Sequence, residues 1–344
     1  MFWGFFGLVS DSLAIDLGTT NTRIYIRGRG IVLDEPSVVA VSESEQTRQI
    51  LAVGEKAARM IGRTPVNIRA VRPMRAGVIG DFEIAQEMIR HFIRRANKRS
   101  DLARPRIIIT APSSSTAVER RAIREAAEAA GARQVFVIEE AMAAAIGAGL
   151  PVTSPTGSMV VDIGGGTTDA AVLSLGGIVC TQSVDVGGQV MDEAIMGHVR
   201  RVYNLLVGEA SAEHVKKTIG SAIVPQSGDG ATMEISGRDL ASGVPQRITV
   251  TEQEIARCLM EPVAAIVGTV KNVLEQVKPE LAADIVDSGI ALTGGAALLR
   301  GIDVVLREAT GLPVFVAPDP LTCGVRGAGQ ALEEMRTLKT VIQS

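Results

Sequence analysis

Residues 160–169 read Val-Val-Asp-Ile-Gly-Gly-Gly-Thr-Thr-Asp, and this stretch decides how the rest of the chain is interpreted. The apolar residues 159–161 are typical of a buried strand, and Asp162 follows at its end. Three successive glycines leave no Cβ in the turn, so backbone N–H groups can approach a bulky anion. A carboxylate beside an anion needs a cation between them, and Mg²⁺ with phosphates is the common case. The alternative is a plain glycine-rich hairpin.

The same pattern occurs earlier, where residues 15–22 read Ile-Asp-Leu-Gly-Thr-Thr-Asn-Thr. Apolar residues lead to Asp16, glycine and hydroxyl residues follow, and residues 23–26 resemble a second strand. A third turn, residues 290–296, has a strand followed by glycines but no carboxylate, which suits the uncharged part of a nucleotide. Two Asp-x-Gly hairpins in one chain therefore predict two similar domains that face each other across a phosphate chain.

These three turns, in this order, resemble those of the superfamily of actins, sugar kinases and heat-shock chaperone ATPases. Within it the chain resembles the MreB family of bacterial actins over nearly its whole length. Four stretches without general chemical meaning carry this resemblance: residues 30–40 (Gly-Ile-Val-Leu-Asp-Glu-Pro-Ser-Val-Val-Ala), 71–74 (Val-Arg-Pro-Met), 117–122 (Ala-Val-Glu-Arg-Arg-Ala) and 237–240 (Gly-Arg-Asp-Leu).

The resemblance implies an α/β protein with the actin-like fold: two similar domains, each with a doubly wound mixed sheet, and a nucleotide in the cleft between them. Domain I is expected in residues 1–150 and 320–344, with a small subdomain at about 36–77. Domain II is expected in residues 151–319, with a small subdomain at about 187–249.

Length and composition agree with this architecture. A chain of 344 residues with 46% hydrophobic residues is long enough for two domains. The net charge of −3 argues against a nucleic-acid-binding protein, which is usually basic. The three cysteines and three histidines are scattered, which predicts buried free thiols in a reducing cytoplasm and no metal site built on these residues. No apolar run approaches the roughly 20 residues that span a bilayer, and the start lacks the basic region of a cleavable signal.

Alternating strand and helix patterns predict mainly parallel, doubly wound sheets. Helix starts are expected at Asp81, at a Thr116–Glu119 capping box, near Asp192, at Ser211 and at a Thr251–Glu254 capping box. The last of these helices is expected to run to Val277.

Residues 1–10 contain the only Trp and three of the seven Phe residues. They predict an interfacial membrane anchor in which Phe2, Trp3, Phe5 and Phe6 lie at the headgroup boundary; the alternative is a tail packed against the protein. The basic residues between 94 and 106 form either a solvated face or a contact with anionic lipid. In the family an apolar loop near this place also touches the membrane, and here Leu102 represents it.

The resemblance implies ATP/ADP, or GTP, as the cofactor, together with Mg²⁺ held by Asp16 and Asp162 largely through water. The residues expected to hold the phosphates are Gly18, Thr19, Thr20, Asn21, Gly164, Gly165, Gly166 and Thr167. Those expected at the adenosine are Glu213, Lys216, Lys217, Gly294, Gly295, Ala296 and Ala297. The first three could equally form ordinary pairs on one helix face.

For hydrolysis, Glu140 and Thr167 match the family positions that orient the attacking water. The family usually has Glu-Pro-Met after the strand, whereas this chain has Glu140, Ala141 and Met142. A proline would restrict Glu140, so Ala141 predicts slow turnover unless the surrounding helix and strand already fix Glu140. This departure is also what a divergent paralogue would show.

Two function classes follow. The first is a cytoskeletal ATPase that forms filaments on the inner face of the cytoplasmic membrane, organises cell-wall synthesis and rod shape with membrane-anchored shape proteins, and hydrolyses ATP slowly as an assembly timer. The second is a soluble small-molecule phosphotransferase of the same fold. A chaperone would need a substrate-binding domain after the ATPase, and this sequence ends at Ser344.

Overall fold

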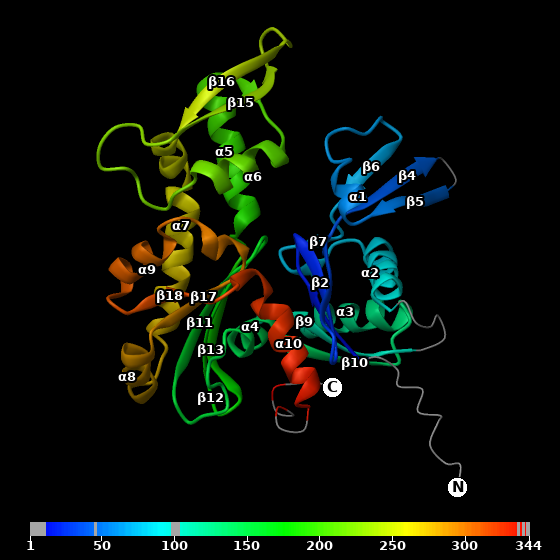
Figure 1. Cartoon of the computed structure of the whole chain (residues 1–344), viewed down its shortest axis with the longest axis vertical. Coiled ribbons are helices and arrows are strands. Elements are labelled where there is room, and N and C mark those ends of the chain that lie inside the picture. The colour runs from blue at the N-terminus through cyan, green and yellow to red at the C-terminus, as the bar shows by residue number, and fades with distance from the viewer. Residues whose placement is uncertain (1–11, 45–46, 98–103, 336–337, 339–340, 342–344) are drawn as a thin grey trace. The chain divides into compact units, whose positions relative to one another are not determined.

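The structure, a computed structural model, describes residues 12–44, 47–97, 104–335, 338 and 341 (Figure 1). It divides into two compact units: unit 1 comprises Met1–Val152 and Thr322–Ser344, and unit 2 comprises Thr153–Leu321. Among the described residues, no helix is both long and apolar enough to cross a membrane. The predicted membrane residues all lie outside the described ranges: Phe2, Trp3, Phe5, Phe6 and Leu102.

Unit 1 is built on a five-stranded sheet with the order β10–β9–β1–β2–β3. The strands are β1 (Leu13–Leu17), β2 (Asn21–Ile26), β3 (Gly30–Pro36), β9 (Arg106–Ala111) and β10 (Gln134–Glu139). The first three form an antiparallel meander, whereas β9 and β10 pair in parallel. The sheet is therefore mixed, and the prediction of mainly parallel sheets is wrong because short turns, which join β1 to β3, give antiparallel neighbours.

Helices flank this sheet (Figure 1). They are α2 (Phe82–Ala96), α3 (Ala117–Ala129), α4 (Glu140–Gly147) and α10 (Cys323–Glu333). Asp81 accepts the N–H of Ile84 at 3.1 Å, which confirms the predicted cap of α2, and the Thr116–Glu119 capping box of α3 is present. Buried side chains of α2 and α3 share one hydrophobic core with alternating residues of β1.

Helices α4 and α10 pack unusually closely. A Cβ on Gly327 would lie 1.8 Å from the carbonyl oxygen of Ala143, and one on Gly147 would lie 1.9 Å from that of Cys323. No side chain fits at either position, so these two glycines let the helix backbones touch.

Unit 1 also has a smaller part. It contains a sheet of order β5–β4–β6 with one short helix, and a hairpin: β4 (Val39–Ser44), β5 (Thr47–Val53), β6 (Ile68–Val71), α1 (Glu55–Ala58), β7 (Met74–Arg75) and β8 (Val78–Ile79). The buried Glu35 on β3 links it to the main part, because its carboxylate accepts the N–H of Glu55 and pairs with Arg95, both at 2.7 Å.

Unit 2 repeats the same sheet, with the order β13–β12–β11–β17–β18. Its strands are β11 (Ser158–Ile163), β12 (Thr168–Ser174), β13 (Gly177–Val184), β17 (Ile290–Thr293) and β18 (Val314–Val316). Again the first three strands are antiparallel, and β17 and β18 join in parallel. β11 to β13 thus correspond to β1 to β3, and β17 and β18 correspond to β9 and β10.

The rest of unit 2 consists of helices and a small sheet of order β14–β15–β16. These elements are α5 (Gly188–Tyr203), β14 (Leu205–Leu206), α6 (Glu209–Ile219), β15 (Thr232–Asp239), β16 (Pro245–Thr251), α7 (Glu252–Leu274), α8 (Pro279–Ser288), the 3₁₀ turn η1 (Gly295–Leu298), α9 (Ile302–Thr310) and, where the chain returns to unit 1, the 3₁₀ turn η2 (Pro320–Thr322). The Thr251–Glu254 capping box of α7 is confirmed.

Three predicted helix boundaries in unit 2 are wrong. Helix α5 begins at Gly188, so Asp192 lies inside the helix instead of capping it, and its carboxylate pairs with Lys216. Helix α6 begins at Glu209 instead of Ser211, and α7 ends at Leu274 instead of Val277. Helix ends depend on which backbone groups find other partners, which residue preferences alone do not determine.

Candidate functional site

The first hairpin joins β1 to β2 and is closed by its own backbone. The N–H of Gly18 donates to the carbonyl oxygen of Asn21 at 3.1 Å. A Cβ on Gly18 would lie 2.7 Å from that same oxygen, so the turn requires glycine there. The side-chain amide of Asn21 donates to Asp34 at 2.8 Å, so this predicted phosphate ligand is engaged with β3.

Neighbouring segments hold the loop after Gly18. The hydroxyl of Thr19 accepts the N–H of Gly77 at 2.9 Å, and the hydroxyl of Ser37 donates to the carbonyl oxygen of Gly18 at 2.7 Å. The hydroxyl oxygen of Thr20, in contrast, is buried and has no hydrogen-bond partner. A buried hydroxyl without a partner costs free energy, so Thr20 is the residue of this loop whose geometry calls for a ligand or water.

Asp16 lies at the end of β1, beside both Thr110 and Arg23. The hydroxyl of Thr110 donates to Asp16 at 3.0 Å, and the guanidinium of Arg23 lies 4.0 Å away. Burial raises the pKa of Asp16 above its ordinary value, and the positive charge of Arg23 opposes that rise. A Cβ on Gly324 would lie 3.1 Å from the Asp16 carboxylate, so the start of α10 comes close to it.

The second hairpin, between β11 and β12, has the same closing bond. The N–H of Gly164 donates to the carbonyl oxygen of Thr167 at 2.9 Å, as that of Gly18 does to Asn21. The carbonyl oxygens of Gly164 and Gly165 accept hydrogen bonds from the start of α5. The N–H of Gly188 donates to Gly164 at 3.0 Å, and the N–H of Gln189 donates to Gly165 at 2.8 Å. The first turn of α5 therefore holds this hairpin in place.

Asp162, at the end of β11, corresponds to Asp16. Thr293 on β17 donates its hydroxyl to Asp162 at 2.7 Å, and the two residues are register partners on parallel strands. On the other side, the register partner of Asp162 is Asp169, which accepts a short hydrogen bond from Ser183. The position that holds an arginine in unit 1 thus holds a second carboxylate in unit 2.

The third predicted turn follows β17 and lies against Asp162. Gly294 has a φ of 83°, and a Cβ there would lie 2.3 Å from the carbonyl oxygen of Ile163 and 2.9 Å from the Asp162 carboxylate. Both the positive φ and the lack of space for a Cβ therefore require glycine at position 294. The side chains of Ala296 and Ala297 are buried in the core of unit 2. A ligand at this turn would therefore contact their backbone.

The predicted adenosine residues on α6 fall into two groups. Lys216 is mostly buried: its ammonium donates to the carbonyl oxygen of Gly188 at 2.6 Å and pairs with Asp192 at 2.8 Å. Lys217 and Glu213 form an exposed i,i+4 pair at 2.7 Å, as the alternative interpretation of the sequence predicts. Burial raises the pKa of Asp192 to about 6, even though Lys216 acts in the opposite direction.

The two predicted water-orienting residues lie in different units. Glu140 is the first residue of α4 and directly follows Glu139, the last residue of β10. Its backbone is thus fixed by a strand on one side and a helix on the other. Thr167 is nearly buried and closes the second hairpin through its carbonyl oxygen.

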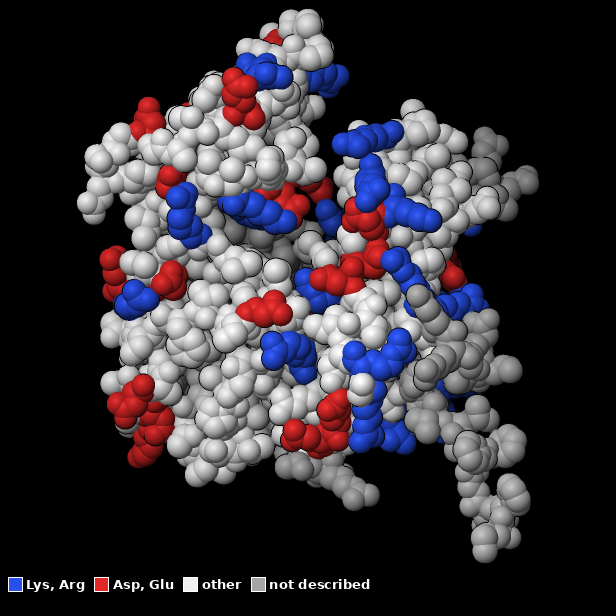
Figure 2. Space-filling view, in the orientation of Figure 1, with Lys and Arg blue, Asp and Glu red and all other residues white. Residues whose placement is uncertain are grey.

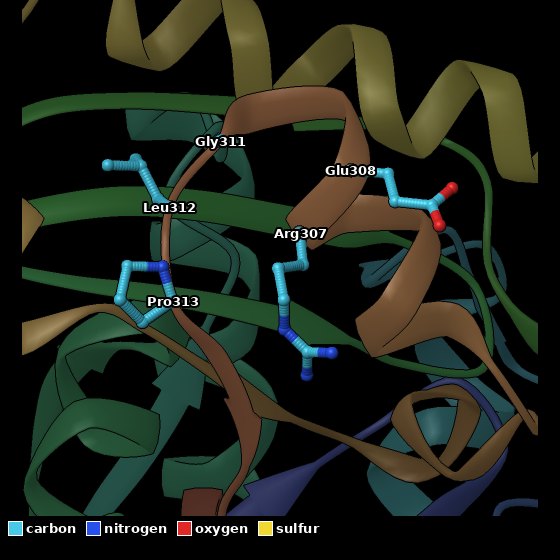
Figure 3. A pocket seen from close by; sticks show the side chains of 5 residues that line it. All are labelled: Arg307, Glu308, Gly311, Leu312 and Pro313. Atoms are coloured by element: carbon cyan, nitrogen blue, oxygen red, sulfur yellow. The ribbon is translucent and has the colours of Figure 1, made fainter.

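Two other features of the surface do not contribute to this site. An open hollow beside α9 is lined by Arg307, Glu308, Gly311, Leu312 and Pro313, none of which is a predicted site residue (Figure 3). Acidic and basic side chains are both present among the described residues on the face seen in Figure 2. Within the described ranges, no group of three or more His, Cys, Asp or Glu residues could hold a metal ion by itself.

Sequence reasoning missed the partners of the two aspartates. Thr293 is the last residue of β17 and Thr110 the last but one of β9, and a threonine that follows a run of apolar residues was the available signal. Arg23 and Asp192 were not singled out as charge partners because their roles depend on cross-strand and cross-helix distances.

Comparison with known proteins identifies the family. The family model for MreB/Mbl proteins matches residues 10–340. The cell shape-determining protein MreB of Escherichia coli (strain K12) is 54% identical over 333 residues, covering 96% of this chain and 95% of the relative. The cell shape-determining protein Mbl of Bacillus subtilis (strain 168) is 47% identical over 331 residues, covering 96% of this chain and 98% of the relative.

Solved structures confirm the predicted fold class. The crystal structure of MreB5 of Spiroplasma citri bound to AMPPNP superposes with a TM-score of 0.87 at 36% identity, covering 96% of this chain and 98% of that chain. A MamK double helical filament superposes with a TM-score of 0.79 at 21% identity, covering 94% of this chain and 99% of that chain. At this identity the match shows that the two chains share a fold. The chain therefore belongs to the MreB/Mbl family and has its actin-like fold.

Proposed function

We propose that this chain is a bacterial actin that binds ATP, polymerises into membrane-attached filaments and determines cell shape. The observation that carries the proposal is the repeated hairpin, in which an aspartate at a strand end precedes a glycine turn closed by one backbone bond. The relatives support it: E. coli MreB is named a cell shape-determining protein, and S. citri MreB5 has been crystallised with AMPPNP and with ADP.

Both hairpins bind the phosphates of one nucleotide in this proposal. Residues 18–21 and 164–167 supply backbone N–H groups, and the partnerless hydroxyl of Thr20 fits a phosphate oxygen. The adenosine lies against Glu213, Lys216, Lys217 and the turn Gly294, Gly295, Ala296 and Ala297. Lys216 reaches this place already fixed by Asp192 and Gly188, which reduces the entropy lost on binding.

The carboxylates Asp16 and Asp162 have the hard oxygen ligands that Mg²⁺ prefers, and two carboxylates with several waters are a usual set for it. When bound, Mg²⁺ neutralises the charge that the phosphates carry and develop. Glu140 and Thr167 orient the water that attacks the terminal phosphate. Hydrolysis is then slow and acts as a timer for filament assembly.

Replacement of Asp162 by Ala tests this assignment. We expect the rate of phosphate release to fall on the order of 100-fold, because one preorganised charge at a reacting phosphate is worth that much. Polymerisation should weaken as well, since it depends on bound nucleotide. Normal ATPase activity in Asp162→Ala would show that the assigned site is wrong.

A second substitution tests the role of Ala141. Because Glu140 is already held between β10 and α4, we expect Ala141→Pro to change the single-turnover rate of hydrolysis by less than about threefold. A large increase would show instead that Ala141 leaves Glu140 too mobile, as in a divergent paralogue with weak hydrolysis.

Sedimentation separates a filament from a phosphotransferase of the same fold. At micromolar concentration with ATP and Mg²⁺, a filament-forming protein pellets at high speed, and the pelleted fraction falls when the nucleotide is removed. A protein that stays in the supernatant under all these conditions would favour the phosphotransferase.

Residues 1–10 attach the filaments to the inner face of the cytoplasmic membrane, with Phe2, Trp3, Phe5, Phe6 and Leu102 in the interface. One anchor binds weakly, but each filament holds many anchors near the surface at high effective concentration. Deletion of residues 2–10 should therefore abolish flotation with liposomes while pelleting remains. Undiminished flotation would place the membrane site elsewhere.

At the membrane, the filaments organise cell-wall elongation together with membrane-anchored shape proteins. Co-purification of such proteins with a tagged chain, lost when filament assembly is blocked by Asp162→Ala, would support these partners; recovery of none of them would contradict the role.

A further inference from the structure

A threonine hydroxyl donates to each of the two hairpin aspartates. Thr110 donates to Asp16 at 3.0 Å, and Thr293 donates to Asp162 at 2.7 Å. Both threonines come from the strand that pairs in parallel with the aspartate's own strand, β9 in unit 1 and β17 in unit 2. The same contact therefore occurs at corresponding positions of two sheets whose sequences differ in most other respects.

Burial makes these hydrogen bonds consequential. Thr110 is 1% exposed and Thr293 is fully buried, so neither hydroxyl exchanges its partner with bulk water. A hydroxyl that donates to a carboxylate fixes the rotamer of that carboxylate. A carboxylate that binds a hydrated Mg²⁺ needs a fixed orientation, since the ion accepts only near-ideal octahedral geometry.

The two contacts differ in one respect that decides which is the cleaner test. The oxygen of Thr110 also accepts the backbone N–H of Leu17, at 3.3 Å, so it also has a structural role in joining β1 to β9. Asp162 is the only hydrogen-bond partner that the structure shows for the Thr293 hydroxyl among the described residues.

We propose that Thr293 and Thr110 are positioning residues: they hold Asp162 and Asp16 in the orientation that binds the hydrated magnesium ion of the nucleotide. This inference rests on the proposed function, because it concerns the same site. It goes further by assigning the orientation of each carboxylate to a threonine on the neighbouring parallel strand.

The test compares Thr293→Val, which removes the hydroxyl at nearly constant shape, with Thr293→Ser, which keeps it. The affinity for a fluorescent ATP analogue is measured by titration at a series of Mg²⁺ concentrations and in EDTA. For Thr293→Val we expect the Mg²⁺ concentration at half-maximal binding to rise on the order of 10-fold, as for other groups that orient metal ligands. Binding in EDTA should be unchanged, and Thr293→Ser should restore the wild-type Mg²⁺ dependence.

A matched control is Thr181→Val on β13. Its hydroxyl donates to the carbonyl oxygen of Ala170 at 3.0 Å, in the same sheet but not to a carboxylate. We expect no change in its Mg²⁺ dependence. An equal shift in Thr181→Val, or an equal loss in Mg²⁺ and in EDTA for Thr293→Val, would overturn the positioning role and leave only a structural one.

The outcome for the wild-type protein separates the two proposals. If wild type binds the nucleotide with a clear Mg²⁺ dependence and Thr293→Val behaves identically, the inference fails and the proposed function stands. If wild type binds no nucleotide with or without Mg²⁺, the proposed function fails and this inference fails with it.

Discussion

In each unit a row of side chains crosses the five-stranded sheet beside the hairpin. The first two residues of the two rows are of the same type, and the last two differ. In order across the strands, the row in unit 1 is Thr110, Asp16, Arg23 and Asp34, and the row in unit 2 is Thr293, Asp162, Asp169 and Ser183. The threonine–aspartate hydrogen bond is present in both units. The third member is a cation in one row and a carboxylate in the other.

The repeated topology therefore places side chains at corresponding positions in the two units, whereas the charges of these side chains differ between the units. The guanidinium of Arg23 lies 4.0 Å from the carboxylate of Asp16 and 3.1 Å from that of Asp34. Its positive charge therefore compensates the negative charges of the same row. In the second row two carboxylates are register partners, and each accepts a hydrogen bond from a neighbouring hydroxyl: Asp162 from Thr293, and Asp169 from Ser183. Corresponding aspartates therefore have a neighbouring arginine in unit 1 and a neighbouring carboxylate in unit 2.

The largest effect should come from removing the internal cation of unit 1. In Arg23→Met, Asp16 loses its counter-charge at a largely buried position, and we expect a loss of about 3 kcal/mol in the free energy of unfolding at pH 7.5. The pKa of Asp16, already raised by burial, should rise further. The deficit should shrink as the pH falls, because a protonated Asp16 needs no counter-charge.

Urea unfolding of wild type and Arg23→Met at pH 7.5 and 5.5 measures both effects. The control is Arg121→Met, which removes an exposed i,i+4 pair with Glu125 and should cost far less, because solvent screens that pair. Equal losses for the two variants would mean that Arg23 does not compensate a buried charge.

A smaller effect should distinguish the two turns. In Gly18→Ala the new Cβ would lie 2.7 Å from the carbonyl oxygen of Asn21, whereas in Gly164→Ala it would lie 3.2 Å from that of Thr167. We expect the first to destabilise by about 1–3 kcal/mol and the second by less than about 1 kcal/mol. Thermal unfolding without nucleotide measures both. The opposite ranking would show that the two turns are not the same structure.

A pH-dependent effect concerns Lys216, the cation of unit 2 that pairs with Asp192. Burial raises the pKa of Asp192 to about 6, Lys216 and Lys217 lower it, and Glu213 raises it. The folded chain therefore binds this proton more tightly than the unfolded chain does. As the pH falls through 6 towards 4, wild type should gain stability relative to Asp192→Asn. Urea unfolding of both proteins between pH 7.5 and 4.5 tests this; a difference that is flat or declines towards low pH would contradict it.

The sequence predicts the parts of the fold that depend on local pattern. The apolar runs before Asp16 and Asp162, the capping boxes at Thr116 and Thr251, and the cap at Asp81 all appear where residue preferences place them. Each of these features is decided within a few residues of chain. The resemblance to a family then supplied the arrangement into two domains, which no local pattern contains.

The rest depended on contacts between distant residues. Asp192 has the side chain of a helix cap, but Gly187 is the N-cap residue of α5, so Asp192 lies inside the helix and pairs with Lys216. Thr110 and Thr293 are ordinary strand residues until pairing places them beside the aspartates, 94 and 131 residues away along the chain. A threonine after an apolar run marks each candidate, but the sequence does not specify which aspartate it will lie beside.

In the proposed function, Asp16 and Asp162 serve one nucleotide. Isothermal titration with ATP, in Mg²⁺ and in EDTA, should be carried out on wild type, Asp16→Asn, Asp162→Asn and the double variant. We predict one ATP per chain, a loss of the Mg²⁺-dependent gain in affinity in each single variant, and a double variant little weaker than either, because both carboxylates act on the same ion. Losses that add in full, or two bound nucleotides per chain, would contradict the claim and leave two independent sites.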